Sequence, residues 1–231
     1  GLKLHTHNIT AVVTVADDGG SSGILRSDLG MLAPGDVRNC VSALAEVDPV
    51  MGELLNFRFK DGSLKGHSLG NLFLAALNET SSSFDEAVKK FSHLTGVVGT
   101  VYPVTNESVT LSALLEDGRL IEGESHIGVH HDGPKNGIVK LMVNPEKPKA
   151  VDGVIKALEK ADIIVLGPGS LYTSIIPNLL VDGVVDAIKK SNAVKIYVCN
   201  IMSQAGETEN YTVSDHLAAI ERHSYEGIAD I

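Results

Sequence analysis

The first third of the chain predicts one strand followed by several short helices. Residues 9–15 (ITAVVTV) are a nearly continuous apolar and β-branched run, which is typical of a strand buried on both faces. Helical patterns follow at 23–29, 36–46, 50–57, 72–77 and from Ser83 onward. Asp36 stands where the N-cap of the second of these helices is expected.

The rest of the chain predicts an antiparallel hairpin and then strands that alternate with helices. Residues 108–116 alternate between apolar and polar, Asp117-Gly118 is a two-residue turn signal, and residues 119–125 return. Further elements are expected, in chain order, at 138–143 (strand), 151–160 (helix), 163–166 (strand), 178–190 (helix), 195–200 (strand) and 214–222 (helix). The pattern predicts an α/β, Rossmann-like, doubly wound and mostly parallel sheet with helices on both faces and an inserted β-hairpin. We expect a single domain over residues 1–231.

Composition and charge narrow the possible functions. The 231 residues are 43% hydrophobic and 21% charged, which suits a large core and excludes a disordered chain. A formal charge of −10 argues against a nucleic acid polymer as partner, because a phosphate backbone needs a basic face. No run approaches the ~18 consecutive apolar residues of a membrane span, and no signal peptide is seen, so a cytoplasmic location is expected. Cys40 and Cys199 are expected to be buried, reduced thiols.

Three loops follow predicted strands, where open parallel sheets bind their ligands. They are residues 16–23 (ADDGGSSG), 167–170 (GPGS) and 200–208 (NIMSQAGET). The first two offer backbone N–H groups and hydroxyls, as a phosphate cradle requires, although short Gly/Ser turns are often only structural. The phosphate interpretation gains weight if both loops lie at one edge of the sheet.

Asp17 and Asp18 need a physical reason to stand in a phosphate loop, because carboxylates repel phosphates. They would hold Mg²⁺ together with the phosphates, accept hydrogen bonds from ribose hydroxyls, or belong to a solvated turn that caps the next helix. They are therefore the candidate catalytic residues and metal ligands. The loops lack lysine, and only Arg26 and Arg38 lie near in sequence, so backbone dipoles or a metal would supply most of the neutralisation.

Polar residues also mark the starts of two predicted helices. Asp36, Arg38 and Asn39 open one helix, and His67 and Asn71 flank the start of another. They would line a pocket, although capping alone explains Asp36 and Asn71 equally well. No residue set forms an evident nucleophile–base pair. Other polar clusters are expected to be surface side chains and not metal ligands: His5, His7, His126, His130, His131 and Asp132.

Five motifs occur in the order of one known family. They are ADDGGSSG, PGDVRNC, GHSLGN, GPGSLYTSIIPNLL and the GET-containing loop, and together they span essentially the whole chain. The sequence resembles the bacterial gluconeogenesis factors, which are related to 2-phospho-L-lactate transferase. The resemblance implies a Rossmann-like, cytoplasmic, often dimeric protein. The transferase branch joins a phospholactyl group from a guanosine diphosphate carrier to a deazaflavin alcohol with Mg²⁺. The gluconeogenesis branch is implicated in cell shape and wall metabolism on gluconeogenic carbon and is associated with nucleotide sugars.

The motifs and the resemblance together give one set of expected ligand-binding residues. In chain order they are Asp17, Asp18, Gly19, Gly20, Ser21, Ser22, Asp36, Arg38, Asn39, His67, Asn71, Gly167, Pro168, Gly169, Ser170, Tyr172, Thr173 and Asn200. The family normally has a strand and a GGGTG-type loop ahead of residue 1, and continues beyond residue 231, so this set is expected to be partial.

Two functions remain open at this point. The ADDGGSSG form resembles the gluconeogenesis branch, which favours a regulatory factor that binds a nucleotide sugar or dinucleotide and forms a homodimer. The alternative is a transferase that uses a nucleotide-diphosphate donor, with Asp17 or Asp18 holding Mg²⁺. Turnover of the bound nucleotide would distinguish them.

Overall fold

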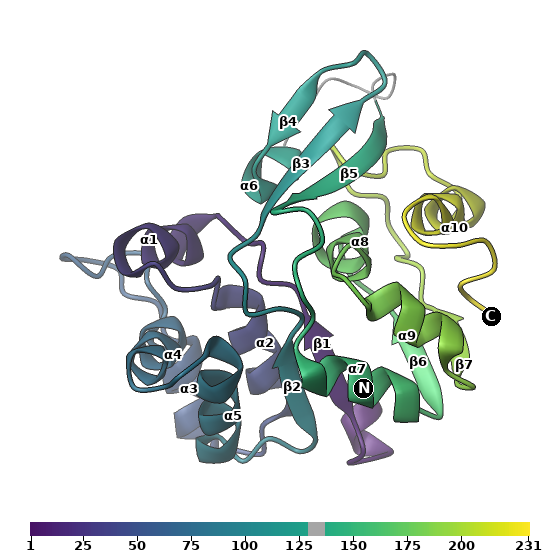
Figure 1. The fold of residues 1–231 in the computed structure, drawn as a ribbon. Helices are drawn as coiled ribbons and strands as arrows, with labels where there is room; N and C mark the ends of the chain where they lie inside the picture. Colours follow the sequence, from purple (N-terminus) through teal and green to yellow (C-terminus); the bar gives the residue numbers. More distant parts are fainter. Residues whose placement is uncertain (129–136) are drawn as a thin grey trace. The chain divides into compact units, whose positions relative to one another are not determined.

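A computed structural model describes residues 1–128 and 137–231 of the chain (Figure 1). Its contacts divide the chain into two compact units, residues 1–108 (unit 1) and 109–231 (unit 2). Each unit combines helices with small β-sheets. A single domain over the whole chain stays a prediction.

Unit 1 has one parallel pair of strands and five α-helices. Its elements are η1 (Leu2–Leu4), β1 (Thr10–Val13), α1 (Gly20–Leu29), α2 (Gly35–Leu44), α3 (Pro49–Asn56), α4 (Leu69–Glu79), α5 (Phe84–Leu94) and β2 (Thr100–Pro103). β1 pairs in parallel with β2, and α2 and α5 pack against the strands (Figure 1). The core lies between them, where Val37, Val41, Val88 and Phe91 are fully buried. Burial of these apolar side chains is the main source of stability here.

The helix starts of unit 1 follow from local capping, with one departure from prediction. Ser68 caps α4 by accepting a hydrogen bond from Asn71 N, and Ser83 caps α5 in the same way. Asp36 was expected to cap α2, but that prediction is wrong, because the helix begins one residue earlier, at Gly35. Asp36 lies in the first turn, where its side chain faces a pocket described below.

Unit 2 has an antiparallel sheet and a second parallel pair. Its elements are β3 (Thr110–Leu115), β4 (Leu120–Glu122), α6 (Glu124–Ile127), β5 (Ile138–Asn144), α7 (Asp152–Lys160), β6 (Ile163–Leu166), η2 (a π-helical turn, Leu171–Ile175), α8 (Ile176–Leu179), α9 (Val184–Lys190), β7 (Val194–Tyr197) and α10 (Val213–Arg222). β3 lies between β4 and β5, and β6 pairs in parallel with β7 (Figure 1). The helix expected at 178–190 is interrupted, because Gly183 adopts φ +85° and α9 begins after it.

The mixed α/β class is confirmed, with parallel strands and helices in the described residues. The predicted turn at Asp117-Gly118 joins the antiparallel strands β3 and β4. One continuous doubly wound sheet with this hairpin as an insertion stays a prediction, because the sheets of the described residues are small.

Two smaller predictions concern the thiols and the membrane. Cys40 and Cys199 are free but only half-buried, and burial, aided by the nearby Asp36 carboxyl, raises the pKa of Cys40 to about 11. Within the described residues, no helix combines the length and the apolar character that crossing a bilayer requires.

Candidate functional site

The loop after β1 brings the first turns of α1 and α2 together. A Cβ atom on Gly35 would lie 2.6 Å from Ser22 Oγ and 2.8 Å from Asp17 Oδ2. A Cβ atom on Gly23 would lie 2.1 Å from the backbone oxygen of Asp18. Only glycine fits both positions without a shift of the loop or its side chains. The unpaired N–H groups of two helix N-termini therefore face one region, and such groups attract anions.

A cavity of about 180 Å³ opens at these helix ends, and we refer to it as the unit 1 pocket. Its lining residues are Asp17, Gly19, Gly20, Ser21, Ser22, Gly35, Asp36, Arg38, Asn39, Arg58 and Asn71. Every site residue predicted within unit 1 is in this lining except Asp18 and His67. Residues from α1, α2, α4 and two loops thus meet around one space.

Four buried polar side chains form a continuous series of contacts beside the pocket. Arg38 Nε donates to Asn71 Oδ1 at 3.4 Å, and Asn71 Nδ2 donates to Ser21 Oγ at 3.2 Å. Ser21 Oγ in turn lies 3.0 Å from His67 Nδ1. All four side chains belong to residues that are at most 8% exposed. This series, named here the Arg38–His67 network, satisfies groups that would otherwise be costly to bury.

Arg38 is anchored so that part of its guanidinium remains for the pocket. Besides its contact with Asn71, it donates from Nη1 to Asn56 Oδ1 at 2.7 Å. Gly70 packs against its methylenes, since a Cβ atom there would lie 2.9 Å from Arg38 Cδ. Burial lowers the pKa of Arg38, and the neighbouring Arg58 lowers it further, but a guanidinium stays charged at neutral pH.

The pocket also contains two carboxyl groups. Burial raises the pKa of Asp36, the Asp17 carboxylate adds to the rise, and Arg38 opposes it. Asp17 Oδ1 accepts a hydrogen bond from Gly19 N at 2.9 Å, which fixes the turn into α1. Two guanidinium groups and two carboxyl groups therefore share one cavity. Such a set suits a ligand that carries phosphates together with hydroxyls or a divalent cation.

A divalent cation would need ligands from outside the protein. Across residues 1–128 and 137–231, no three His, Cys, Asp or Glu side chains are grouped closely enough to hold a metal. Asp17 and Asp36 supply carboxylate oxygens, which Mg²⁺ prefers, but Mg²⁺ takes six ligands and keeps several waters or substrate oxygens. The pocket therefore fits Mg²⁺ only when phosphate or water completes its coordination.

The predicted GPGS loop of unit 2 is held by its own side-chain partner. Gly167 adopts φ +83°, and a Cβ atom there would lie 2.8 Å from Val198 O, so this position requires glycine. The Gly169 N–H donates to Asn200 Oδ1 at 3.2 Å, and Asn200 Nδ2 donates back to Gly169 O at 2.7 Å. Asn200 thus ties the loop after β7 to the loop after β6.

A buried carboxylate contacts the donors that were predicted to bind phosphate in unit 2. Glu207 accepts hydrogen bonds from Tyr172 N at 2.9 Å and from Thr173 Oγ1 at 3.1 Å. Gln204 Nε2 donates to the same carboxylate at 2.9 Å. The Tyr172 hydroxyl is 2.9 Å from the Tyr211 hydroxyl and donates to a backbone oxygen. A phosphate in unit 2 would have to displace Glu207 or Asn200 to reach these donors. A phosphate role therefore stays a prediction for all seven residues: Gly167, Pro168, Gly169, Ser170, Tyr172, Thr173 and Asn200.

Comparison with known proteins assigns the family. The family model described as 2-phospho-L-lactate transferase CofD matches residues 1–231. The chain belongs to the CofD family. Among its relatives are the gluconeogenesis factors of Halalkalibacterium halodurans, 48% identical over all of this chain and 70% of that protein, and of Bacillus subtilis, 46% identical over all of this chain and 72% of that protein. These findings confirm the resemblance that the five motifs indicated.

A solved structure supports the fold of this CofD-family chain, and other relatives show how its length compares. A crystal structure of a Bacillus halodurans protein has a TM-score of 0.95 and 48% identity, and it covers all of this chain and 73% of its own. A relative from Clostridium acetobutylicum is 53% identical over 96% of this chain. The chain spans about half the length of that relative (49%) and of another from Nostoc (48%).

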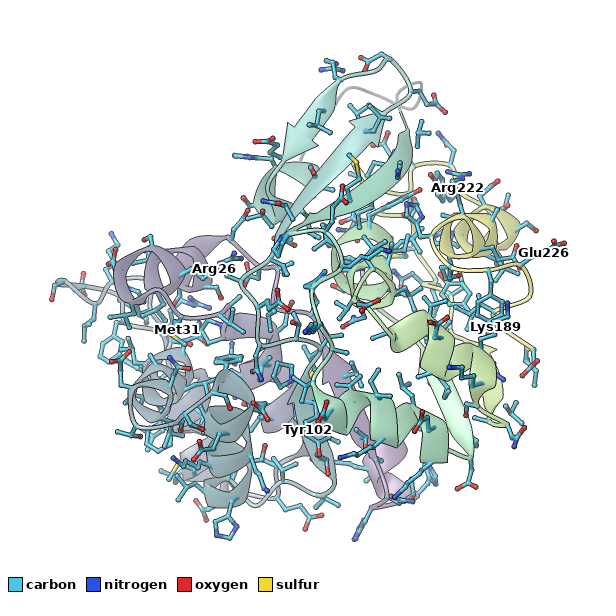
Figure 2. All side chains as sticks on the ribbon, in the orientation of Figure 1. Arg26, Met31, Tyr102, Lys189, Arg222 and Glu226 are labelled. Atoms are coloured by element: carbon cyan, nitrogen blue, oxygen red, sulfur yellow. The ribbon has the colours of Figure 1, made fainter. Side chains whose placement is uncertain are left out.

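Two arginines have roles that the sequence did not reveal. Arg26, labelled in Figure 2, lies near the phosphate loops in sequence but does not line the unit 1 pocket. Its Nη1 donates to the backbone oxygens of Ala16 and Asp17, at 3.1 Å each, so it holds the loop after β1. Arg58 lines the pocket instead, from the loop after α3, where its guanidinium also donates to Gly66 O. The sequence indicated Arg58 only as a positively charged residue shortly before the GHSLGN motif.

The structure also supplies a pair that the sequence did not reveal. Ser21 and His67 are 46 residues apart, yet their side chains lie at hydrogen-bond distance. His5, His7 and His126 are exposed, as expected. The remaining residues of that histidine prediction, His130, His131 and Asp132, lie outside the described residues.

Proposed function

We propose that this chain binds a nucleotide diphosphate, either a nucleotide sugar or a dinucleotide, and that the unit 1 pocket holds the diphosphate. As part of a gluconeogenesis factor, it would act in carbon metabolism and in the control of cell shape during gluconeogenic growth. We further propose that it works in the cytoplasm as a homodimer. The names of its relatives support the metabolic role, and the chemistry of the pocket supports the ligand.

The observation that carries this proposal is the position of Arg38. Arg38 is a buried residue, its guanidinium is oriented by two amide oxygens, and it lines a cavity at two helix N-termini. A preorganised guanidinium binds phosphate through paired, charge-assisted hydrogen bonds. Arg58 adds a second positive charge at the same cavity. Together with the helix dipoles, the two arginines supply the neutralisation that the lysine-free loops lack.

The carboxyl groups of the pocket distinguish the two hypotheses for function. In a binding factor, Asp17 and Asp36 accept hydrogen bonds from ribose or sugar hydroxyls, as acidic residues do in dinucleotide folds. In the alternative, a 2-phospho-L-lactate transferase-like enzyme, they hold Mg²⁺ against the diphosphate. The alternative is supported by the Asp17 carboxylate, which adds to the rise that burial causes in the pKa of Asp36, since a cation would stabilise both carboxylates. We favour the binding factor.

The proposal is tested by calorimetric titration of UDP-glucose and of NAD, each with Mg²⁺ and with a chelator. Arg58 is exposed, so Arg58→Ala should leave the fold intact. The variant should weaken binding at least about tenfold, which corresponds to the loss of one charged hydrogen bond of ~1.5 kcal/mol. Arg119→Ala is the matched control, because Arg119 is an exposed arginine of the β3–β4 turn.

The outcomes separate the hypotheses. Binding that is insensitive to chelator, with the nucleotide recovered intact, supports the binding factor. Binding that requires Mg²⁺, with a cleaved nucleotide detected by mass analysis, establishes the transferase instead. Equal affinities for Arg58→Ala and Arg119→Ala would remove the unit 1 pocket from the proposal.

A further inference from the structure

The Arg38–His67 network fixes where its protons lie. Arg38 Nε is only a donor, so the Asn71 oxygen must face it, and the Asn71 NH₂ group must face Ser21. Ser21 Oγ therefore accepts from Asn71. Its single proton remains for His67 Nδ1, 3.0 Å away, as long as that nitrogen carries no proton.

A proton on His67 Nδ1 changes what Ser21 offers to the pocket. Ser21 Oγ would then accept from both Asn71 Nδ2 and His67 Nδ1, and its own O–H would be released. Ser21 lines the unit 1 pocket, at the first turn of α1. The released O–H is then an additional donor for an anion there, beside the N–H groups of the helix.

We propose that an anionic ligand in the unit 1 pocket binds together with a proton. His67 takes up this proton, and the Ser21 hydroxyl that is thereby released donates a hydrogen bond to the ligand. His67 is in this sense a positioning residue, because it acts through Ser21 and does not line the pocket itself. The inference rests on the proposed function, and it adds the regulation of that site by pH.

The unit 1 pocket beside the network holds charges of both signs. The guanidinium groups of Arg38 and Arg58 and the carboxyl groups of Asp17 and Asp36 line it together, close to a balance. The other charged residues of the loop ahead of α4, Lys60, Asp61 and Lys65, are exposed. A diphosphate adds two negative charges beside the arginines, which shifts the balance towards the imidazolium of His67. Affinity should therefore rise as the pH falls.

The start of α4 and the backbone at His67 are held without the His67 ring. Ser68 already caps α4 by accepting from Asn71 N. The backbone of His67 is held separately, since its N–H donates to Leu64 O and its oxygen accepts from Phe59 N. His67→Asn keeps a polar group near the position of Nδ1 but cannot take up a proton. This variant is expected to fold and to bind.

The test is calorimetric titration of UDP-glucose and NAD, whose diphosphates are diesters without a group that titrates near neutral pH. Titrations at pH 6, 7 and 8 in two buffers of different ionisation enthalpy give the number of protons taken up. The wild-type protein should take up protons and gain affinity at lower pH, approaching at most about tenfold per pH unit. His67→Asn should show neither effect. His93→Asn, at an exposed histidine of α5, should match the wild type.

Each result decides the inference. Wild-type binding without proton uptake, or uptake that persists in His67→Asn, overturns the inference and leaves the proposed function standing. Failure of the wild type to bind either diphosphate overturns the proposed function, and this inference with it. If His67→Asn does not fold, Ser21→Ala replaces it, and affinity that still rises at low pH in that variant contradicts the relay through Ser21.

Discussion

Replacing Gly70 should damage both stability and the unit 1 pocket, because α4 approaches α3 and the Arg38 side chain of α2 too closely for a side chain. A Cβ atom on Gly70 would lie 2.6 Å from Leu55 O, 2.9 Å from Arg38 Cδ and 3.0 Å from Arg38 Cγ. Leu55 O is backbone and cannot rotate away. Arg38 can move only by giving up its contacts with Asn56 and Asn71.

The magnitude follows from two opposing effects. Alanine in place of glycine in a helix stabilises by up to about 1 kcal/mol. Overpacking of a buried contact costs typically ~1–3 kcal/mol, and a disturbed buried hydrogen bond adds about 1 kcal/mol. We expect Gly70→Ala to lower the free energy of unfolding by about 1–3 kcal/mol and to weaken binding of UDP-glucose at least about tenfold.

Gly52→Ala provides the matched control, since it places alanine in the neighbouring helix α3 with room to spare. The nearest atom to its Cβ would be Val47 Cγ2 at 3.8 Å, an ordinary contact. That variant should be as stable as the wild type or up to about 1 kcal/mol more stable, with unchanged affinity. Urea unfolding and calorimetric titration measure both quantities. If Gly70→Ala behaves like Gly52→Ala, the close approach of α4 to Arg38 does not build the pocket.

Two further predictions concern unit 2. Gly167→Ala should lower the unfolding midpoint in urea, because Gly167 has a positive φ and its Cβ would contact Val198 O. Gly169→Ala should be nearly neutral, because its Cβ would lie 3.4 Å from Ser174 Cβ, and equal midpoints for the two variants would contradict this. Burial lowers the pKa of His223, whose Nε2 accepts from Leu141 N at 2.8 Å. The unfolded chain therefore binds this proton more readily, and stability should decline as the pH falls below about 6.5, an effect that His223→Gln should reduce; identical pH profiles for both proteins would refute the assignment.

Much of the unit 1 pocket could be predicted from sequence because its residues lie in short motifs. The run 9–15 identifies a strand, which the structure places at Thr10–Val13 with only Val13 buried. A loop rich in glycine and serine directly after a strand is typical of a ligand-binding turn in α/β folds. Asp36, Arg38 and Asn39 share one helix start, so their proximity follows from local structure. These local relations need no knowledge of long-range packing.

The parts that sequence did not predict depend on packing between distant residues. Arg58 reaches the pocket from a loop, and nothing in its own neighbourhood fixes its direction. The contact between Ser21 and His67 exists only because α1 and α4 pack together. Glu207 accepts hydrogen bonds from Tyr172 and Thr173, about 35 residues earlier in the chain, and no hydrophobic periodicity indicates that these residues meet. Competition between a carboxylate of the protein and a phosphate for the same N–H group cannot be read from motifs.

The most direct test of the account is a crystal structure of the protein with bound UDP-glucose or NAD. The account predicts that the diphosphate lies in the unit 1 pocket, within hydrogen-bond distance of the Arg38 and Arg58 guanidinium groups and of the first N–H groups of α1. Ordered ligand whose diphosphate contacts neither arginine, or lies instead at residues 167–173 with Asn200 or Glu207 displaced, would contradict it.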